Sequence, residues 1–432
     1  MARDIFTPGF KTEPYWLDDM VPADTGTPEF PAAVDVLVVG AGYTGLSAAI
    51  ETARGGRSTL VIDAEHAGWG CSSRNGGQIS TSIKPSYDDL CRRYGRERGT
   101  AVAREGHEAL AWIEAFIARE AIDCDFSVVG RFHAAHNAKQ FEALAAGVGK
   151  RPARLEIPAE VVPRSEQHRE LGTDAYWGGV VYPKHASLQP AKFHKGLVER
   201  ALASGAVIVP FCPATRIERS GKGFSATTGR GTVEARDVVI ATNGYTGTVT
   251  PWQRRRVIPI GSYVIATEPI APDVMDRLMP GQRIISDTRK VVYYYRPSPD
   301  RTRIVFGGRV SAGETDPAVS GPRLHADLVG LFPELRDIRV SHSWAGLVAF
   351  TFDTLAHTGV HDGMHYAMGY CGSGVSMAGY LGMRTGQKVL GLKEGRTGFD
   401  DIGFRTRPFY TGNPWFLSAS VAYYRWRDRQ GW

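Results

Sequence analysis

The sequence of 432 residues contains few cysteines and no long apolar run. Its five cysteines are odd in number, lie far apart and form no C-x-x-C pair: Cys71, Cys91, Cys124, Cys212 and Cys371. This pattern argues against a disulfide framework and against a zinc site. No stretch of 18 or more apolar residues exists, so we expect no membrane span. The N-terminus shows no charged segment followed by an apolar core, so we expect no signal peptide and a cytoplasmic protein.

Charge of neither sign is concentrated anywhere in the sequence. Lys and Arg number 51 against 45 Asp and Glu, a mild net charge of +6, and the basic residues are scattered. The densest basic run, Arg254-Arg255-Arg256, is typical of a solvated loop. We therefore expect no nucleic-acid partner. A chain of this length can bury more than one core, so two domains are expected.

The strongest pattern lies in residues 34–63 and predicts a βαβ unit. A β-branched apolar run is followed by G-A-G-Y-T-G at residues 40–45, and an amphipathic helix begins near Leu46. Such glycines permit a tight turn, the approach of a pyrophosphate and close packing of helix on strand. The helix N-terminus favours phosphate groups. The second strand ends in Asp63, whose carboxylate can accept hydrogen bonds from ribose hydroxyls. The unit predicts dinucleotide binding; the alternative is a glycine-rich turn in another α/β protein.

Two further glycine-rich segments follow predicted buried strands. The first, G-W-G-C-S-S-R-N-G-G-Q at residues 68–78, combines small residues with several hydrogen-bond donors. Small residues let the backbone lie against a flat or extended ligand, and this loop is expected at the carboxyl end of the sheet, where ligands bind. The alternative is a surface loop. The second segment, residues 370–375, lies between a strand and a helix and indicates another backbone contact to the same cofactor.

The remaining segments alternate between helical and strand patterns. Helices are expected over residues 86–121, 137–150, 188–204 and about 376–390. Strands are expected over residues 126–134, 207–209, 215–218, 223–227, 231–235, 237–244, 263–267, 291–296, 303–309, 338–352 and 364–369. The alternating strands after residue 257 predict an antiparallel sheet, a natural wall for a substrate site.

Six sequence motifs together resemble the FAD-dependent amine and D-amino-acid oxidoreductases, the group with glycine oxidase, monomeric sarcosine oxidase and γ-glutamylputrescine oxidoreductase. They span residues 34 to about 382: V-V-G-A-G-Y-T-G-L-S-A-A, W-G-C-S-S-R-N-G-G-Q, A-T-N-G-Y, F-G-G-R, W-A-G-L with T-x-D, and G-Y-C-G-S-G-V. The loop S-x-R-N-G-G-Q and the tail R-P-F-Y-T-G-N-P-W-F-L are most similar to the γ-glutamylputrescine branch.

The resemblance implies an α/β fold with a Rossmann-like, glutathione-reductase-like FAD-binding domain and an inserted antiparallel-sheet α+β substrate domain. We expect an N-terminal arm of residues 1–33. The FAD-binding domain is expected to comprise residues 34–86, 165–250 and 340–432. The substrate domain is expected to comprise residues 87–164 and 251–339.

The resemblance also implies which residues contact FAD. The glycines of the first turn would hold the pyrophosphate, Asp63 the adenosine ribose, and the second and third glycine-rich segments the flavin. The expected cofactor contacts are Gly40, Gly42, Tyr43, Thr44, Gly45, Asp63, Ala64, Gly70, Ser72, Ser73, Arg74, Asn75, Gly76, Gly77, Gln78, Thr242, Asn243, Gly244, Gly372, Ser373, Gly374 and Val375.

The sequence departs from the family pattern in three places. Relatives with covalent flavin use a Cys or His at defined positions; the W-A-G-L strand has no Cys and the first glycine-rich loop has no His, so we expect noncovalent FAD. Ala356 replaces the usual Pro of T-x-D-x-x-P, and Ser373 replaces a frequent His. Ser376 and Met377 occupy the region where some relatives carry a carboxylate-binding Lys, which argues against a substrate of the sarcosine type.

The resemblance implies oxidation of a primary or secondary amine, such as a γ-glutamylated polyamine or an N-alkyl amino acid. FAD accepts a hydride from the carbon next to a neutral amine, and the resulting imine hydrolyses to an aldehyde or keto product. Oxygen or another acceptor then takes the electrons. Five residues are candidates for contact with the substrate, although aromatic residues on such strands are also common in cores: Tyr263, Tyr295, Arg309, Trp344 and His357.

Other functions stay open at this level. One alternative is an oxidase or dehydrogenase of the D-amino-acid, glycine or sarcosine type. A more distant one is an NAD-dependent dehydrogenase, although a single G-x-G-x-x-G with distant glycine-rich segments fits FAD better. The last alternative is a nonenzymatic FAD-binding module. The sequence does not indicate an oligomeric state.

Overall fold

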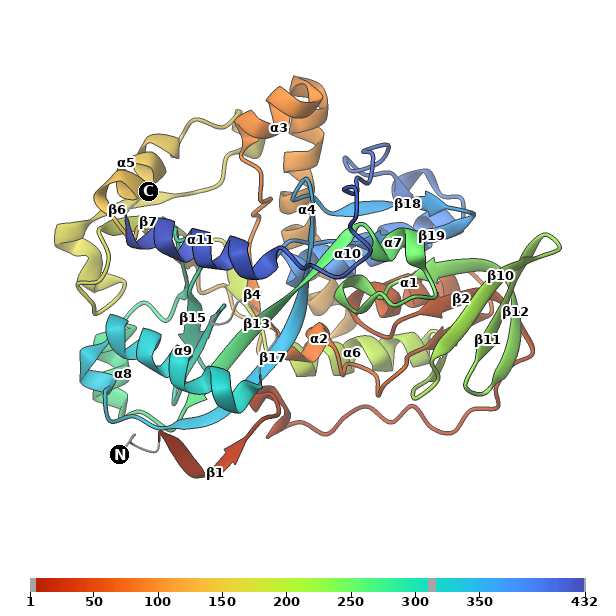
Figure 1. The fold of residues 1–432 in the computed structure, drawn as a ribbon, viewed down its shortest axis with the longest axis horizontal. Helices are drawn as coiled ribbons and strands as arrows, with labels where there is room; N and C mark the ends of the chain where they lie inside the picture. The colour runs from red at the N-terminus through yellow and green to blue at the C-terminus, as the bar shows by residue number, and fades with distance from the viewer. Residues whose placement is uncertain (1–4, 310–315, 431–432) are drawn as a thin grey trace.

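Two large β-sheets with their helices make up the structure (Figure 1). The computed structural model describes residues 5–309 and 316–430. In Figure 1 the sheet that contains β2 and β12 lies on the right, and the sheet that contains β7, β15 and β17 extends to the left. They are called here the first and the second sheet.

The first sheet contains the βαβ unit predicted for residues 34–63. Its parallel strands, in spatial order, are β9 (Val207–Val209), β3 (Thr59–Ile62), β2 (Ala33–Val39), β12 (Gly231–Ile240) and β19 (Met364–Met368). Three antiparallel strands extend it: β11 (Gly223–Thr228), β10 (Ala214–Ser220) and β18 (His357–His361). Both faces of β2 and β3 are covered, which explains their continuous apolar runs.

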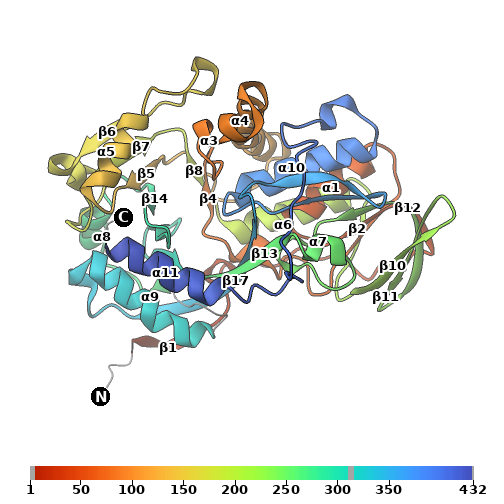
Figure 2. The same cartoon turned by 45° about the horizontal axis from the view of Figure 1, so that its top comes forward.

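Helices from four distant segments cover one face of the first sheet. They are α1 (Tyr43–Arg54), α4 (Arg96–Glu120), α6 (Pro190–Ala203) and α10 (Gly374–Val389), and they lie together in Figure 2. Leu46, Ala49 and Ile50, the predicted apolar stripe of α1, are completely buried there. The helix α3 (Tyr87–Tyr94) precedes α4 and packs against it.

The second sheet is mostly antiparallel. Its strands, in spatial order, are β1 (Phe6–Lys11), β17 (Val340–Thr351), β13 (Val257–Thr267), β16 (Ile304–Gly308), β15 (Tyr294–Pro297), β14 (Ile284–Asp287), β5 (Arg131–Ala134), β7 (Gly178–Tyr182) and β6 (Glu160–Pro163). A small ladder, β4 (Gln78–Ile79) with β8 (Ala186–Ser187), lies beside it. Because side chains alternate along a strand, the two faces of this sheet carry different residues.

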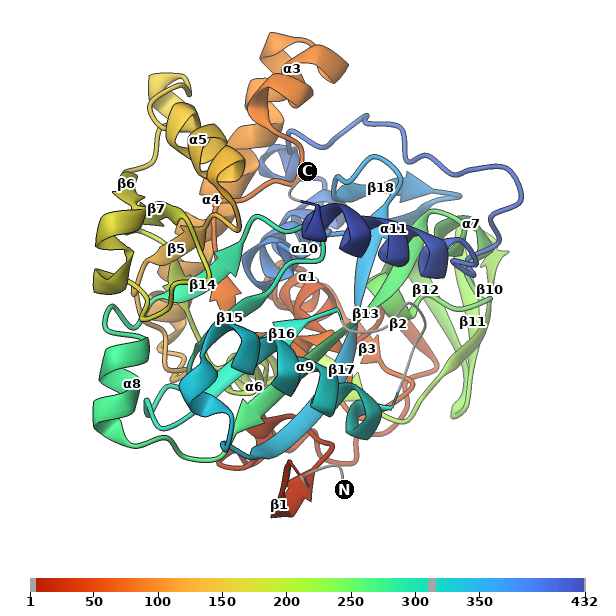
Figure 3. The same ribbon diagram turned by 60° about the vertical axis from the view of Figure 1, so that its left-hand side comes forward.

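Helices α8 (Pro272–Leu278) and α9 (Pro317–Leu331) cover the outer face of the second sheet. Figure 3 shows α9 lying across β15, β16 and β17. The C-terminal helix α11 (Leu417–Arg429) is attached to residues 290 and 291 through Asp428 and to residue 309 through Arg425. Three shorter helices are α2 (Cys71–Arg74), α5 (Ala138–Gly147) and α7 (Pro251–Arg254).

The N-terminal arm is anchored on both sheets. β1 pairs with β17, and the Trp16 side chain is 1% exposed. The indole Nε1 of Trp16 donates to the carbonyl oxygen of Asn75 at 2.8 Å. The arm therefore contacts the glycine-rich segment 68–78 directly.

Several predicted boundaries differ from the structure. The expected strands 231–235 and 237–244 form one strand, β12, because its pairing with β2 continues through the polar positions 236 and 237. The strand expected at 126–134 begins only at Arg131, after Gly130 with φ of +73°. The strand expected at 291–296 begins at Tyr294.

The observed packing of the two sheets differs from the predicted domain division in two respects. β17, assigned to the FAD-binding domain, is a strand of the second sheet. α4, assigned to the substrate domain, contributes Val102, Ile113 and Phe116 to the core beside the first sheet. Within the described residues, no helix is both long and apolar enough to cross a membrane.

Candidate active site

A cavity of about 500 Å³ extends along the carboxyl ends of the first sheet. Segments that are far apart in the sequence line it: the 40–45 turn, the 63–72 segment, the 241–250 segment, part of β17 and the 370–378 segment. Fourteen of the predicted cofactor contacts belong to the lining: Gly40, Gly42, Tyr43, Thr44, Asp63, Ala64, Gly70, Ser72, Asn75, Thr242, Asn243, Gly372, Gly374 and Val375. The three glycine-rich segments therefore meet in one place.

The N-termini of two helices lie at this cavity. Gly42 is the N-cap of α1 and Ser373 is the N-cap of α10, and neither cap forms a side-chain hydrogen bond to its helix. The Ser373 hydroxyl instead donates to the carbonyl oxygen of Ser82 at 2.7 Å. Uncapped helix N-termini favour negative charge. The cavity thus offers two separate sites for anionic parts of one extended ligand.

The turn between β2 and α1 is so tight that only glycine fits at two of its positions. Gly40 has φ of +110°, a conformation that other residues rarely adopt. A Cβ atom added at Gly45 would lie 1.9 Å from the carbonyl oxygen of Gly40. These contacts allow α1 to begin directly over the end of β2 and keep its first turn open to the cavity.

Asp63 closes this turn from the end of β3. One carboxylate oxygen, Oδ2, accepts from the Ala41 N–H at 2.7 Å, and Oδ1 accepts from the Glu65 N–H at 3.0 Å. Burial raises the pKa of the carboxyl above its usual range, and these two hydrogen bonds oppose the shift. The carboxylate keeps acceptor capacity on the side of the cavity, as contact with a ribose requires.

We expect Asp63→Asn to weaken FAD binding about tenfold, because one of the two backbone N–H groups loses its acceptor, a cost of about 1.4 kcal/mol. The dissociation constant is measured from the fluorescence of FAD added to the apoprotein. Asp35→Asn is the matched control, since Asp35 accepts from the Ser58 N–H at 2.9 Å near the opposite ends of the same two strands. Equal effects of the two substitutions would contradict a specific role of Asp63.

The other predicted contacts in the 68–78 segment support this wall of the cavity. The Ser72 Oγ accepts from the Tyr43 N–H at 3.0 Å, which joins this segment to α1. The amide of Gln78 donates to the carbonyl oxygens of Ile285 and Tyr295, which joins it to the second sheet.

Eight predicted contacts lie outside the lining: Gly45, Ser73, Arg74, Gly76, Gly77, Gln78, Gly244 and Ser373.

Three cysteines line the cavity: Cys71, Cys212 and Cys371. The Cys71 Sγ donates to the carbonyl oxygen of Leu347 at 3.0 Å, and the Cys371 Sγ donates to that of Gly369 at 3.1 Å. Burial raises the pKa of the Cys71 and Cys371 thiols to about 11. These two thiols are therefore protonated, and weakly nucleophilic, at neutral pH.

The five residues predicted to contact substrate do not line the cavity. Tyr263 and Tyr295 are completely buried in the core on the outer face of the second sheet, under α8 and α9. Trp344 is completely buried on the opposite face and donates to the carbonyl oxygen of Arg74 at 2.9 Å.

The last two candidates are also held by neighbouring groups. His357 is 1% exposed, bonds to the Asp353 carboxylate at 3.0 Å and stacks on Phe404. Arg309 donates to the carbonyl oxygen of Gly261 at 2.7 Å. The roles of these five residues in catalysis stay predictions.

Three residues that were not predicted as site residues lie on the face of the second sheet opposite its outer core. Tyr294 precedes the completely buried Tyr295 in β15 and points the opposite way. Its hydroxyl is 2.8 Å from the Ser262 Oγ, and its ring is 3.0 Å from where a Cβ of Gly76 would lie. On β5, Arg131 and His133 alternate with the core residue Phe132 and share the Tyr294 face. The sequence showed that polar and apolar residues alternate along these strands. It did not show which face of the sheet is turned to the first sheet.

Lys84 and Arg131 lie near Ser82 and the N-terminus of α10 and are called here the cationic cluster. The Lys84 residue is exposed to solvent, yet partial burial of its ammonium by the surrounding protein lowers its pKa, and repulsion by Lys290 and Arg131 lowers it further. Arg131 donates to the Ser82 Oγ at 3.0 Å, and its Nε has no partner. In residues 5–309 and 316–430, no carboxylate forms an ion pair with either side chain.

The cationic cluster adjoins the end of the cavity that lies at α10. The Lys84 Cε is 3.9 Å from where a Cβ of Gly372 would lie, and the Lys84 Nζ lies over the Phe350 ring at 5.9 Å from its centroid. A second, small cavity is lined by both Lys84 and Ser373. His133 stays neutral beside these charges, because burial and repulsion from Arg131 and Lys84 lower its pKa to about 3.

Together, the βαβ unit, the cavity at its carboxyl end and the adjoining second sheet define a dinucleotide-binding protein with a separate wall for a substrate. Residues 35–388 match the family DAO, "FAD dependent oxidoreductase". The chain belongs to this family and is an FAD-dependent oxidoreductase. The predicted family, the fold class, the enzyme class and FAD as the cofactor are thereby confirmed.

Relatives and solved structures agree with this assignment. The chain is 30% identical over 431 residues to "Probable oxidoreductase OrdL" of Rhizobium meliloti (strain 1021), covering 98% of each chain. It is 29% identical over 402 residues to "Gamma-glutamylputrescine oxidoreductase" of Escherichia coli (strain K12), covering 92% of this chain and 93% of the relative. The fold is similar to that of glycine oxidase from Geobacillus kaustophilus, with a TM-score of 0.71 at 19% identity over 88% of this chain and 99% of the other.

Proposed function

We propose that this enzyme oxidises a primary or secondary amine that also carries a carboxylate, such as a γ-glutamylated polyamine or an N-alkyl amino acid. The cationic cluster beside the flavin end of the cavity is the observation that carries the proposal. Lys84 and Arg131 have no carboxylate counterion in the described residues, so a substrate carboxylate could form charge-assisted hydrogen bonds with both. The similarity to the E. coli relative favours the γ-glutamylated polyamine.

The residues of the chain would hold FAD along the whole cavity. The N-terminus of α1 would bind the pyrophosphate, Asp63 the adenosine ribose, and the N-terminus of α10 the flavin pyrimidine. When bound there, FAD supplies a hydride acceptor for the carbon next to the substrate nitrogen. Water then hydrolyses the iminium product to a carbonyl compound and an amine or ammonia.

The cationic cluster serves this chemistry in two ways. Hydrogen bonds and ion pairs from Lys84 and Arg131 would orient the substrate carboxylate. The same positive charges disfavour a protonated amine in their neighbourhood and so lower its pKa. The substrate thus reacts as the free amine, without a dedicated general base from the protein.

The visible spectrum of the holoenzyme under anaerobic conditions tests this function. γ-Glutamylputrescine, N-acetylputrescine, sarcosine and D-amino acids are added in turn. We expect bleaching of the flavin bands by γ-glutamylputrescine, and bleaching by N-acetylputrescine, which lacks the carboxylate, only at much higher concentration. Sarcosine and D-amino acids also carry a carboxylate, so bleaching by these alone would keep the acid-bearing amine and replace the γ-glutamylated polyamine by an α-amino acid. A yellow protein that no amine bleaches would refute the proposal. Readmission of air then shows whether oxygen accepts the electrons.

We further propose that FAD is bound noncovalently, since the Cys71 and Cys371 thiols are protonated and no histidine lines the cavity in the described part of the chain. Precipitation of the holoenzyme with trichloroacetic acid should leave all the flavin in the supernatant. Yellow precipitate would contradict this, and the variants Cys71→Ala, Cys212→Ala and Cys371→Ala would then identify the linkage. The described cysteines are all free, which fits the cytoplasm as the compartment.

A further inference from the structure

His133, Ser286 and Tyr294 lie in one row across the second sheet. Ser286 of β14 is the register partner of His133 on β5 and of Tyr294 on β15. Directly paired residues of neighbouring strands point to the same face of a sheet, so these three side chains share the face opposite the outer core. Arg131 lies two positions before His133 on β5 and belongs to the same face. This polar face is called here the inner face of the second sheet.

Three contacts attach the inner face to the segments that are expected to hold the flavin. At one end of the row, a Cβ atom at Gly76 would lie 3.0 Å from the Tyr294 ring. Beside the row, the Gln78 amide donates to backbone carbonyl oxygens of β14 and β15 at 3.2 and 3.1 Å. Beyond the other end, Arg131 donates to the Ser82 Oγ, and the Ser82 carbonyl oxygen accepts from the N-cap hydroxyl of α10. The row therefore lies between two of the glycine-rich segments.

The hydrogen bonds of His133 determine which of its ring nitrogens carries the proton. Nδ1 lies 3.1 Å from the carbonyl oxygen of Ser286 and 3.0 Å from the Ser286 Oγ. A carbonyl oxygen can only accept, so Nδ1 is the protonated nitrogen. The ring is neutral, because burial and repulsion from Arg131 and Lys84 lower its pKa to about 3. Nε2 therefore carries no hydrogen and is a hydrogen-bond acceptor.

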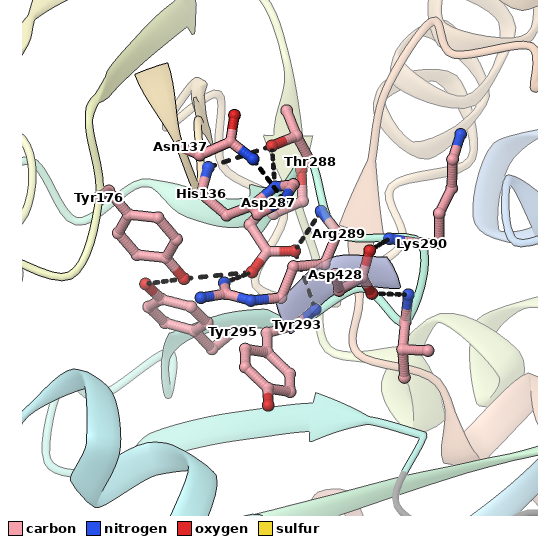
Figure 4. Close-up of polar contacts among 12 residues, drawn as sticks. His136, Asn137, Tyr176, Asp287, Thr288, Arg289, Lys290, Tyr293, Tyr295 and Asp428 are labelled. Carbon is pink, nitrogen blue, oxygen red and sulfur yellow. Dashed lines mark hydrogen bonds and ion pairs between the residues drawn. The ribbon is translucent and has the colours of Figure 1, made fainter. Parts of the chain in front are cut away.

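The Nε2 of His133 has no donor among the described residues. The side chain is half-buried, and this nitrogen keeps accessible surface. His136, three positions further along, is different (Figure 4). Its Nδ1 lies 2.7 Å from the Thr288 Oγ1, and its Nε2 lies 3.0 Å from the Asn137 Nδ2. Both ring nitrogens of His136 are thus bonded within the protein, whereas His133 keeps one for a ligand.

The donors and the acceptor in this region suit different parts of one ligand. Arg131 and Lys84 can only donate hydrogen bonds, so they suit a carboxylate. The Nε2 of His133 can only accept, so it suits an N–H group close to that carboxylate. Residues two positions apart on a strand are about 7 Å apart, a spacing that one small head group can bridge. An α-amino acid carries a carboxylate and an ammonium group on one carbon atom and offers both partners together.

We propose that His133 determines specificity, and that the acid end of the substrate is an α-amino-acid head group. Its carboxylate binds Arg131 and Lys84, and its ammonium group donates to the Nε2 of His133. This inference rests on the proposed function and deepens it, because it separates a γ-glutamylated polyamine, which has the complete head group, from an amine that carries a plain carboxylate. The head group and the amine that is oxidised are then different parts of the substrate.

Ligand pairs that differ in the α-ammonium group test this inference on the holoenzyme. As substrates, γ-glutamylputrescine is compared with N-glutarylputrescine, which lacks that group. As ligands, 2-methylglutamate is compared with 2,2-dimethylglutarate, in which a methyl group replaces the ammonium. Neither ligand has a hydrogen on the substituted α carbon, so neither can be oxidised there. Their Kd values are measured from the change that each makes to the flavin absorbance.

We expect the wild type to bind 2-methylglutamate about tenfold more tightly than 2,2-dimethylglutarate, since it gains one hydrogen bond from a charged group. The KM values of the two putrescine derivatives should differ by about the same factor. His133→Phe, which keeps a ring without an acceptor, should abolish both preferences. His133→Gln, whose amide oxygen can accept, should retain part of them. His136→Phe is the matched control and should leave both preferences as in the wild type.

Three results overturn the inference while leaving the proposed function intact. The first is equal affinity of the wild type for the two dicarboxylates, and the second is a preference that persists in His133→Phe. If that variant does not yield folded protein, His133→Leu replaces it in the same comparison. The third is bleaching by sarcosine or D-amino acids alone, because the head group would then contain the oxidised amine.

The proposed function fails separately, when no amine bleaches the flavin. In that event the two dicarboxylates still test the head-group site, because their binding needs no turnover. A preference for 2-methylglutamate that depends on His133 supports the site, and equal Kd values refute it.

Discussion

Substitution of Gly45 by alanine should weaken FAD binding at least a hundredfold. The added methyl group would lie 1.9 Å from the carbonyl oxygen of Gly40 and 3.0 Å from the Val38 Cγ1. The obstacle is backbone, so α1 must move away from the end of β2. Its open N-terminus, one of the two anion sites of the cavity, then leaves its position. A hundredfold loss corresponds to about 2.7 kcal/mol, well within the cost of such a clash.

Two glycine variants calibrate this result. A Cβ at Gly42 would lie 2.9 Å from the Ser72 Oγ, a side-chain atom that can rotate away, so Gly42→Ala should weaken FAD binding about tenfold. A Cβ at Gly147, in α5, meets no atom within 4 Å, so Gly147→Ala should bind FAD normally. The measurements are the Kd of FAD by fluorescence titration and the thermal stability of the apoprotein. A Gly45→Ala variant that binds FAD within threefold of the wild-type Kd would contradict this explanation of the turn.

Those parts of the fold that depend on local pattern could be predicted from the sequence. The βαβ unit combines a buried apolar strand, a glycine turn and a 3.6-residue apolar period, and each signal lies within a few residues of the next. Much of the cavity lining could also be predicted, because the segments that follow parallel strands meet at the carboxyl edge of the sheet. Residues 370–375 and 40–45 line one cavity for this reason, although more than 300 positions separate them; their contact with one cofactor stays a prediction.

Features that depend on long-range packing could not be predicted. An apolar stripe on α4 indicates burial, but not which sheet covers it, and α4 packs on the helices of the first sheet. The aromatic run at 293–295 alternates as a strand should, yet nothing local says which face meets the cofactor. Tyr295 lies in the outer core, whereas Tyr294 faces the FAD-binding side. Because side chains alternate along a strand, a shift of one position moves a tyrosine to the opposite face of the sheet and so decides whether it can contact a ligand.

The cationic cluster was missed for a related reason. Lys84 and Arg131 come from different segments, and each looks like an ordinary surface charge in its own segment. Only the fold shows that both lie beside Ser82, with no carboxylate paired to either in the described residues. Two neighbouring positive charges without a counterion are a candidate site for an anion.

Lys84→Met should raise KM for an acid-bearing amine about thirtyfold at neutral pH, with kcat changed much less. A hydrogen bond to a charged group is worth about 1.5–3 kcal/mol, and about 2 kcal/mol corresponds to this factor. KM for N-acetylputrescine should stay within twofold, which separates loss of a carboxylate contact from general damage. The thermal stability should stay equal or rise, because burial disfavours the charged lysine in the folded state. A variant with lower stability and an equal loss for both amines would instead indicate a structural role.

The pH dependence supplies the decisive comparison for Lys84. Its pKa lies below that of an ordinary lysine because of burial and the charges of Lys290 and Arg131, an effect that Cys371 opposes, while His133 is neutral. The folded protein therefore releases this proton at a lower pH than the unfolded chain does, and stability should rise with pH between the two pKa values. KM for the acid-bearing amine should rise over the same range as the positive charge is lost. In Lys84→Arg the charge persists, so KM should stay low to higher pH. In Lys84→Met the alkaline rise of KM that is due to the lysine should be absent, because its charge is already lost at neutral pH; an unchanged alkaline rise in that variant would assign the titration to another group.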